Sequence, residues 1–201
     1  MKSLGITGNI GSGKSSVLEF LKEMGNTTFD LDDIAKNFYK TDSVIKNNVI
    51  DIFPNVKSID NQIDTKKLGE IVFKDSMKLK ALQEIIWPNV EKYILNKIDS
   101  TSELIIFEGA LIIEAGWYKH FDFIWIIDSK VELSKERVLK NRNLSNNDFE
   151  TILNHQKNTN TMTEILKKDK IQYSIISNNY DLQYLKKLIK KEFVNLNLKL
   201  N

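Results

Sequence analysis

Apolar and polar positions alternate along the chain in a way that predicts five short buried strands separated by longer helical stretches. Each strand is a short apolar run, and the residues between the runs repeat at the three- and four-residue spacing of amphipathic helices. Strands that alternate with helices indicate an α/β fold: a parallel sheet with helices on both faces, joined by right-handed crossovers. The predicted strands are Leu4–Thr7, Thr27–Phe29, Leu104–Phe107, Phe123–Ile127 and Tyr173–Ile176.

The segment between the second and third strands is too long for one crossover helix. It contains several helical patterns, so we expect a helical, substrate-binding insertion over about residues 36–100. Pro88 falls inside the last pattern and should kink that helix or begin a new one. The patterns cover Asp33–Lys40, Val44–Ile52, Thr65–Phe73 and Ser76–Asp99.

Two further helices follow the fourth strand, at Val131–Asn141 and Asn147–Asn158. Ser145 or Asn146 is suited to cap the second of them. We expect this charged pair, over about residues 131–158, to form a small helical lid. Tyr184–Leu196 reads as the final helix. The 201 residues therefore predict a single domain with its core at about 1–35, 102–130 and 160–201.

Composition narrows the classes of protein further. Apolar residues make up 41% and charged residues 28% of the chain, as in ordinary folded proteins. The net charge of +2 gives no reason to expect a nucleic-acid partner. The absence of cysteine excludes disulfides, thiolate zinc sites and thiol nucleophiles. No apolar run approaches the ~18 residues of a membrane helix, and no signal peptide is evident. We expect a cytoplasmic monomer or weak homo-oligomer that acts on a small molecule.

The segment Gly8–Ser15 fits G-x-x-x-x-G-K-[S/T], the phosphate-binding loop of nucleoside-triphosphate enzymes. It lies between a predicted strand and a predicted helix, so the positive end of the helix dipole would face the phosphates. Lys14 would reach the β- and γ-phosphates of ATP, and the Ser15 hydroxyl would ligate Mg²⁺. The predicted nucleotide contacts are Gly8, Asn9, Ile10, Gly11, Ser12, Gly13, Lys14, Ser15 and Ser16.

Acidic residues follow the second and third strands, where an open parallel sheet binds its ligands. Strand alternation would place Asp30 and Asp32 on one side, where one can take a proton from an attacking hydroxyl and Asp30 can help Ser15 to hold Mg²⁺. The alternative is that one of these acids only caps the following helix. Glu108 and Glu114 are further candidates for a water-mediated Mg²⁺ contact, or solvent-exposed acids without function.

The two arginines of the chain, Arg137 and Arg142, both lie in the predicted lid. A planar guanidinium stays charged and suits the spreading negative charge of a transferring phosphoryl group. We therefore assign both to catalysis, with surface ion pairing as the alternative. The tetrapeptide Asn96–Asp99 matches the guanine-binding N-K-x-D of GTPases, but the residues before it indicate a helix instead of a buried strand, so we discount it.

With these residues in place, the chain resembles the dephospho-coenzyme A kinase family over nearly its whole length. The phosphate loop is shared with many kinases, and its combination with the Asp30-Leu31-Asp32 segment is the specific part. The matching segments are Ile6–Ser16, Phe29–Ala35, Ile63–Asp64, Lys67–Phe73, Leu82–Pro88, Ala110–Gly116, Gln156 and Asn178–Asn179.

The resemblance implies transfer of the γ-phosphate of ATP to the ribose 3′-hydroxyl of dephospho-coenzyme A, with Mg²⁺. It implies that Asp32 is the base, that Lys14 stabilises the phosphoryl group, and that Ser15 holds the metal. It also implies a P-loop kinase fold with a helical coenzyme-A-facing subdomain and a lid.

Several positions depart from the family pattern. Asn9 stands where a glycine is usual, and asparagine tolerates a left-handed backbone better than most residues. Asn141 occupies the place of the second lid arginine, and Arg142 comes one position later. Because one residue turns a helix by ~100°, Arg142 can substitute only if the helix ends there, as Asn143–Ser145 suggests. The remaining departures, in segments that would contact the substrate, are Thr65, Trp87 and Ala110.

Two other functions remain open from the sequence. The chain could be another small P-loop kinase that phosphorylates a nucleoside monophosphate or a small alcohol. It could also be a regulatory protein that binds nucleotide without transferring phosphate, which the departures at Thr65, Trp87 and Asn141 leave possible.

Overall fold

The predicted strands form one parallel sheet, which confirms the α/β class. The order of its strands is β2-β3-β1-β4-β5, so the strand that leads into the phosphate loop lies at the centre. The bounds of each strand lie within one residue of the predicted ones. The strands are β1 (Ser3–Thr7), β2 (Thr27–Asp30), β3 (Ile105–Glu108), β4 (Phe123–Asp128) and β5 (Tyr173–Ser177).

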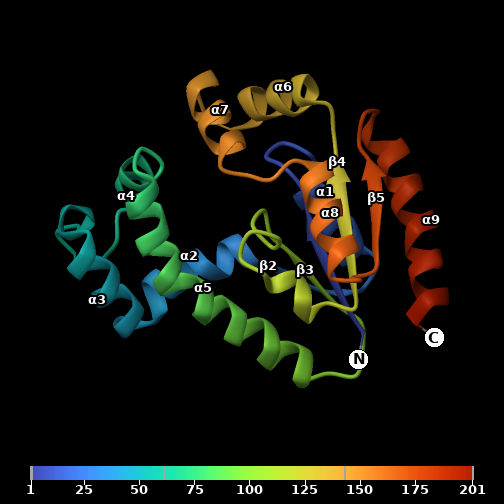
Figure 1. Ribbon diagram of the computed structural model, residues 1–201, viewed down its shortest axis with the longest axis horizontal. Helices are drawn as coiled ribbons and strands as arrows, with labels where there is room; N and C mark the ends of the chain where they lie inside the picture. The colour runs from blue at the N-terminus through green and yellow to red at the C-terminus, as the bar shows by residue number, and fades with distance from the viewer. Residues whose placement is uncertain (1, 61, 143, 201) are drawn as a thin grey trace. The chain divides into compact units, whose positions relative to one another are not determined.

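This computed structural model describes residues 2–60, 62–142 and 144–200. The chain divides into two compact units, of which the first comprises Met1–Asp30 and Ile98–Asn201 and the second Leu31–Lys97. The first unit holds the whole sheet, and the second is built from helices (Figure 1). The boundary falls directly after the last residue of β2.

Helices cover both faces of the sheet because the chain leaves its centre in two directions. From β1 it crosses to β2 through α1 (Lys14–Glu23), and from β4 it crosses the opposite way to β5 through α8 (Thr159–Lys168). Right-handed crossovers in opposite directions place their helices on opposite faces. The closing helix α9 (Leu182–Leu200) shares the face of α1, since both contribute to one buried cluster with β1 and β4 (Figure 1).

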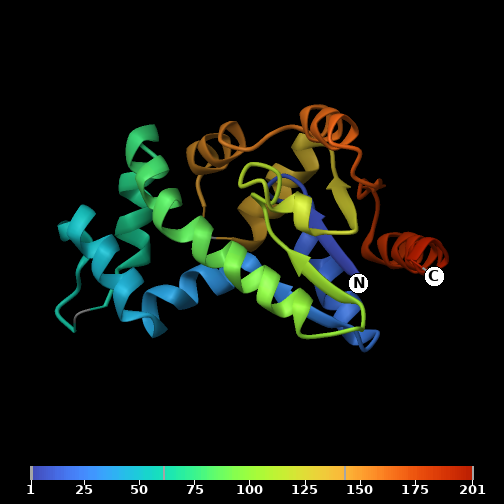
Figure 2. The same ribbon diagram turned by 60° about the horizontal axis from the view of Figure 1, so that its bottom comes forward.

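The second unit contains α2 (Leu31–Thr41), α3 (Ser43–Ile52), α4 (Thr65–Val72) and α5 (Ser76–Asp99), with a 3-10 turn at Pro54–Val56. Figure 2 shows α5 as one continuous helix, so Pro88 begins no new helix. Proline removes a backbone N–H and crowds the preceding turn. In the turn that contains Pro88, the side chain of the next residue, Asn89, donates from Nδ2 to the Ile85 carbonyl at 2.7 Å. Asn96–Asp99 lies at the end of this helix, as expected.

The lid region differs from the prediction in one helix. The first lid helix, α6 (Val131–Asn141), has its predicted bounds, and Ser145 caps α7 (Asn146–Asn154) through a reciprocal capping box with Asp148. However, the predicted Asn147–Asn158 helix stops at Asn154, and a separate helix, α8, follows. Asn158 starts that helix, because its side chain accepts a hydrogen bond from Thr161 N. Asn143 lies outside the described residues.

Helix α7 is attached to the phosphate loop by apolar packing. Phe149 is fully buried and forms a small cluster with Val138 of α6 and Ile10 of the loop. The lid helices therefore bury part of the loop itself.

None of the helices in the described part of the chain combines the length and apolar character needed to span a membrane.

The core between α1, α9 and the sheet predicts a clear difference between two aliphatic-to-alanine substitutions. Leu21 of α1 is fully buried in that cluster, whereas Val194 of α9 is 59% exposed. We expect Leu21→Ala to lower the free energy of unfolding by about 2–5 kcal/mol, because it leaves a cavity. Val194→Ala should change it by less than about 0.5 kcal/mol. Urea unfolding followed by tryptophan fluorescence measures both, and equal effects would contradict this assignment of the core.

Candidate active site

The phosphate loop connects β1 to α1 and adopts a turn that only glycine tolerates at several points. Gly13 has a φ of 99° and caps α1, so the backbone can turn directly into the helix. Gly11 has a φ of 75°, and a Cβ there would collide with Val138 Cγ2 and the carbonyl of Ser134 in α6. Asn9, which replaces a glycine of the family pattern, is not among the described residues with positive φ. The departure at Asn9 therefore requires no backbone strain.

The two residues that complete the motif begin α1. Lys14 is 8% exposed, and its Nζ donates to the carbonyl of Asn9 at 3.2 Å, across the mouth of the loop. Ser15 Oγ donates to Glu108 Oε2 at 3.4 Å, and Glu108, the last residue of β3, is only 2% exposed. The N-terminus of α1 and a nearly buried ammonium thus face the same cradle, which favours an anion.

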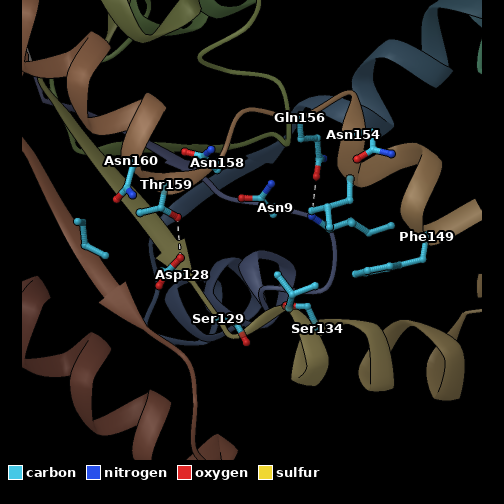
Figure 3. Close-up of a pocket in the computed structure, with 14 residues that line it drawn as sticks. Asn9, Asp128, Ser129, Ser134, Phe149, Asn154, Gln156, Asn158, Thr159 and Asn160 are labelled. Atoms are coloured by element: carbon cyan, nitrogen blue, oxygen red, sulfur yellow. Dashed lines mark hydrogen bonds between the residues drawn. The ribbon is translucent and has the colours of Figure 1, made fainter.

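Side chains from the C-terminal third of the chain hold the loop from outside. Gln156 Oε1 accepts a hydrogen bond from Ile10 N at 2.8 Å, as Figure 3 shows. Asn178, which follows β5, donates from Nδ2 to the carbonyl of Ser12 at 2.7 Å. Sequence reasoning included Gln156 and Asn178 only as parts of a resemblance and assigned them no role.

A basic wall completes the cradle. A cavity of about 200 Å³ lies over the loop, and its described lining residues include Lys14, Arg137, Asn141 and Arg142 but no acid. Helix α6 ends at Asn141, and Arg142 has an extended backbone with φ −126° and ψ 142°. The helix therefore ends where the sequence required it to end if Arg142 is to reach the cradle. Both Asn141 and Arg142 line it.

Arg137 is held in place by the segments at the carboxyl ends of β4 and β5. Its Nη1 donates to Ser129 Oγ at 3.1 Å, and its Nη2 donates to the carbonyl of Asn178 at 3.0 Å. Since Asn178 also binds Ser12, Arg137 and the phosphate loop share one anchor. These hydrogen bonds fix the position of the guanidinium beside the cradle.

Two carboxylates lie at the ends of neighbouring strands. Asp30 is the last residue of β2 and pairs in register with Glu108 of β3, whose carboxylate contacts Ser15. No group of three His, Cys, Asp or Glu side chains within residues 2–60, 62–142 and 144–200 could hold a metal by itself. Mg²⁺ usually takes one or two carboxylates and completes its shell with water and phosphate oxygens. The hydroxyl of Ser15 and the carboxylates of Asp30 and Glu108 are oxygen donors of the kind that Mg²⁺ prefers.

The position of Asp32 differs from the one that strand alternation predicts. Helix α2 begins at Leu31, so Asp32 lies in the first helical turn of the second unit and does not alternate with Asp30 along a strand. It is exposed, two residues after the end of β2.

Glu114 plays a different part from Glu108. Its Oε1 accepts a hydrogen bond from Lys157 N at 2.6 Å, in the segment that precedes α8. Burial raises the pKa of the Glu114 carboxyl, and this hydrogen bond partly opposes the rise. Asn9 Nδ2 donates to the carbonyl of Lys157 at 3.3 Å. Through its Oε1, Glu114 thus anchors the residues that support the loop.

Comparison with known proteins agrees with this site. The family model described as dephospho-CoA kinase matches residues 2–186. The dephospho-CoA kinase of Aquifex aeolicus is 33% identical over 203 residues, covering 98% of each chain.

Two solved structures resemble the fold. A Thermus thermophilus protein is 26% identical with a TM-score of 0.77, covering 97% of each chain. The dephospho-CoA kinase from Campylobacter jejuni is 24% identical with a TM-score of 0.66, covering 98% of each chain. The fold is that of the P-loop kinases, and the chain belongs to the dephospho-CoA kinase family.

Proposed function

We propose that this protein transfers the γ-phosphate of ATP to the ribose 3′-hydroxyl of dephospho-CoA, giving CoA and ADP. The match of the dephospho-CoA kinase family over residues 2–186 carries this proposal. The basic cradle around Gly8–Ser15 supports it, because that cradle suits the triphosphate of a nucleotide. In this proposal the protein works in the cytoplasm as a monomer or weak homo-oligomer.

The transfer needs a group that takes the proton of the acceptor hydroxyl, and we assign that role to Asp32. As the 3′-oxygen forms its bond to the γ-phosphorus, its proton passes to the Asp32 carboxylate. The bond between the γ-phosphorus and the bridging oxygen breaks, and ADP leaves with the electron pair. The position of Asp32, directly after β2 in the Asp30-Leu31-Asp32 segment, supports this assignment.

The cations of the cradle would stabilise the charge that spreads over the moving phosphoryl group. Lys14 has its ammonium at the mouth of the loop, and Arg137 and Arg142 line the same cavity. Because hydrogen bonds already hold Lys14 and Arg137 in place, these groups are positioned before the nucleotide binds. Asn141, which replaces an arginine of the family pattern, lies beside Arg142.

We assign Ser15 and Asp30 to Mg²⁺, with Glu108 as a further oxygen donor. A Mg²⁺ ion held by these oxygens would supply positive charge that offsets part of the negative charge of the triphosphate. Glu108 also orients the Ser15 hydroxyl, because Ser15 Oγ donates to it.

The acceptor can be identified directly by product analysis. The protein is incubated with ATP, Mg²⁺ and one of dephospho-CoA, AMP, CMP or shikimate, and the products are separated chromatographically. We expect 3′-phosphorylated product only from dephospho-CoA. Turnover of another acceptor instead would identify a different small kinase, and ATP binding without any turnover would identify a regulatory protein.

The base assignment predicts that Asp32→Asn lowers kcat at least about 100-fold, since a general base contributes about 10²–10⁴-fold. ATP should bind the variant as it binds the unchanged protein, because the phosphate cradle is intact. Asp33→Asn is the matched control: Asp33 is the neighbouring acid in α2 and pairs on the surface with Lys36 at 3.1 Å. A near-normal kcat for Asp32→Asn would show that the base lies elsewhere.

A further inference from the structure

A second cavity, of about 700 Å³, lies in the sheet unit on another side of the phosphate loop (Figure 3). Asn9 and Ile10, at the start of the loop, line this cavity, whereas Gly11 and Gly13 to Ser16 line the basic cradle. Helix α6 contributes to both cavities, since Ser134 lines the second cavity and Arg137 lines the cradle. Among the residues that the structure describes, none lines both cavities. The proposed chemistry leaves this second cavity without a role.

The charge of the second cavity is opposite to that of the cradle. No Lys, Arg or His is found among its described lining residues, and its one charged residue is Asp128. Asp128 Oδ1 accepts a hydrogen bond from Thr159 Oγ1 at 2.6 Å, so it stays fixed at the wall. A carboxylate without a neighbouring lining cation repels phosphate. The lining therefore disfavours an anionic ligand.

Side-chain amides dominate the polar part of the lining, and hydrogen bonds to the backbone orient three of them. Gln156 Oε1 is occupied by Ile10 N, and Asn158 Oδ1 accepts from Thr161 N at 2.9 Å. Their NH₂ groups have no other partner in the described part of the chain. Asn9 donates its NH₂ to Lys157, which leaves its Oδ1 as an acceptor. The cavity therefore offers both donors and acceptors to a neutral ligand.

The apolar part of the lining distinguishes between two kinds of neutral ligand. A nucleobase usually stacks on an aromatic ring. Phe149 is the one aromatic among the described lining residues, and it is 0% exposed, so it presents no free ring face. Aliphatic side chains such as Val131 and Ile175 supply the remaining apolar surface. A flexible chain of amide and methylene groups matches this lining better than a flat base does.

We propose that this cavity binds the neutral pantetheine arm of the acceptor. The inference rests on the proposed function, because dephospho-CoA carries this arm, with its two secondary amides, beyond its diphosphate. The NH₂ groups of Gln156 and Asn158 donate to the amide carbonyls of the arm, and Asn9 Oδ1 accepts from an amide N–H. The exposed amides of Asn154 and Asn160 add contacts at the rim.

A binding experiment tests the cavity without using turnover. Pantetheine, which lacks adenosine and phosphate, is titrated into the ¹⁵N-labelled protein, and the side-chain NH₂ signals are followed by NMR. We expect the signals of Gln156 and Asn158 to shift, and the dissociation constant to rise about tenfold in the double variant Asn154→Ala/Asn160→Ala, from the loss of two neutral hydrogen bonds. Asn147→Ala, an exposed residue of α7 outside the cavity, is the matched control and should bind as before.

A kinetic experiment connects the cavity to the reaction. The double variant should raise KM for dephospho-CoA about tenfold while leaving kcat and KM for ATP unchanged. Unshifted amide signals with pantetheine, or shifts caused by adenosine instead, would overturn the proposal. Pantetheine binding in a protein that fails to phosphorylate dephospho-CoA would overturn the proposed function while still supporting the chemical class of ligand assigned to the cavity.

Discussion

The hydrogen bonds of Gln156 and Asn178 to the phosphate loop are the constraint on which the rest of the site depends. A loop of this kind binds phosphate only if its backbone N–H groups point inward together. Gln156 holds Ile10 N on one side, and Asn178 holds the carbonyl of Ser12 on the other. The motif supplies the flexibility to form the cradle, and these two amides limit that flexibility to one shape.

The same anchors connect the loop to the basic wall. Asn178 accepts from Arg137 through its carbonyl while its side chain binds Ser12, so one residue sets the distance between guanidinium and loop. Phe149 packs on Ile10, which makes the lid helices part of the support of the loop. The acids Asp30 and Glu108 lie at the strand ends, outside the basic lining. The basic lining therefore suits the phosphates, and the carboxylates at the strand ends suit a metal ion.

Much of this architecture follows from local sequence pattern. The strands are short apolar runs, and α5 and α6 have their predicted bounds, because period-two and period-3.6 patterns depend on neighbouring residues alone. The separate helix α8 was missed because Asn154–Asn158 contains neither Gly nor Pro to mark a break. The supporting role of Asn178 could not be derived, since its partner Ser12 is 166 positions away in the chain. Strand alternation does not extend to Asp32, because α2 begins at Leu31, directly after the last residue of β2.

The dependence of the loop on its outer anchors can be measured with one pair of variants. Gln156→Met keeps the length of the side chain but removes the acceptor of Ile10 N, and Gln172→Met makes the same change at an exposed position before β5. Isothermal titration calorimetry with ATP and Mg²⁺ gives the dissociation constant of each. We predict that Gln156→Met weakens ATP binding about tenfold, the cost of one lost hydrogen bond at the loop, and that Gln172→Met leaves it unchanged. Equal affinities for both variants and the unchanged protein would contradict the account.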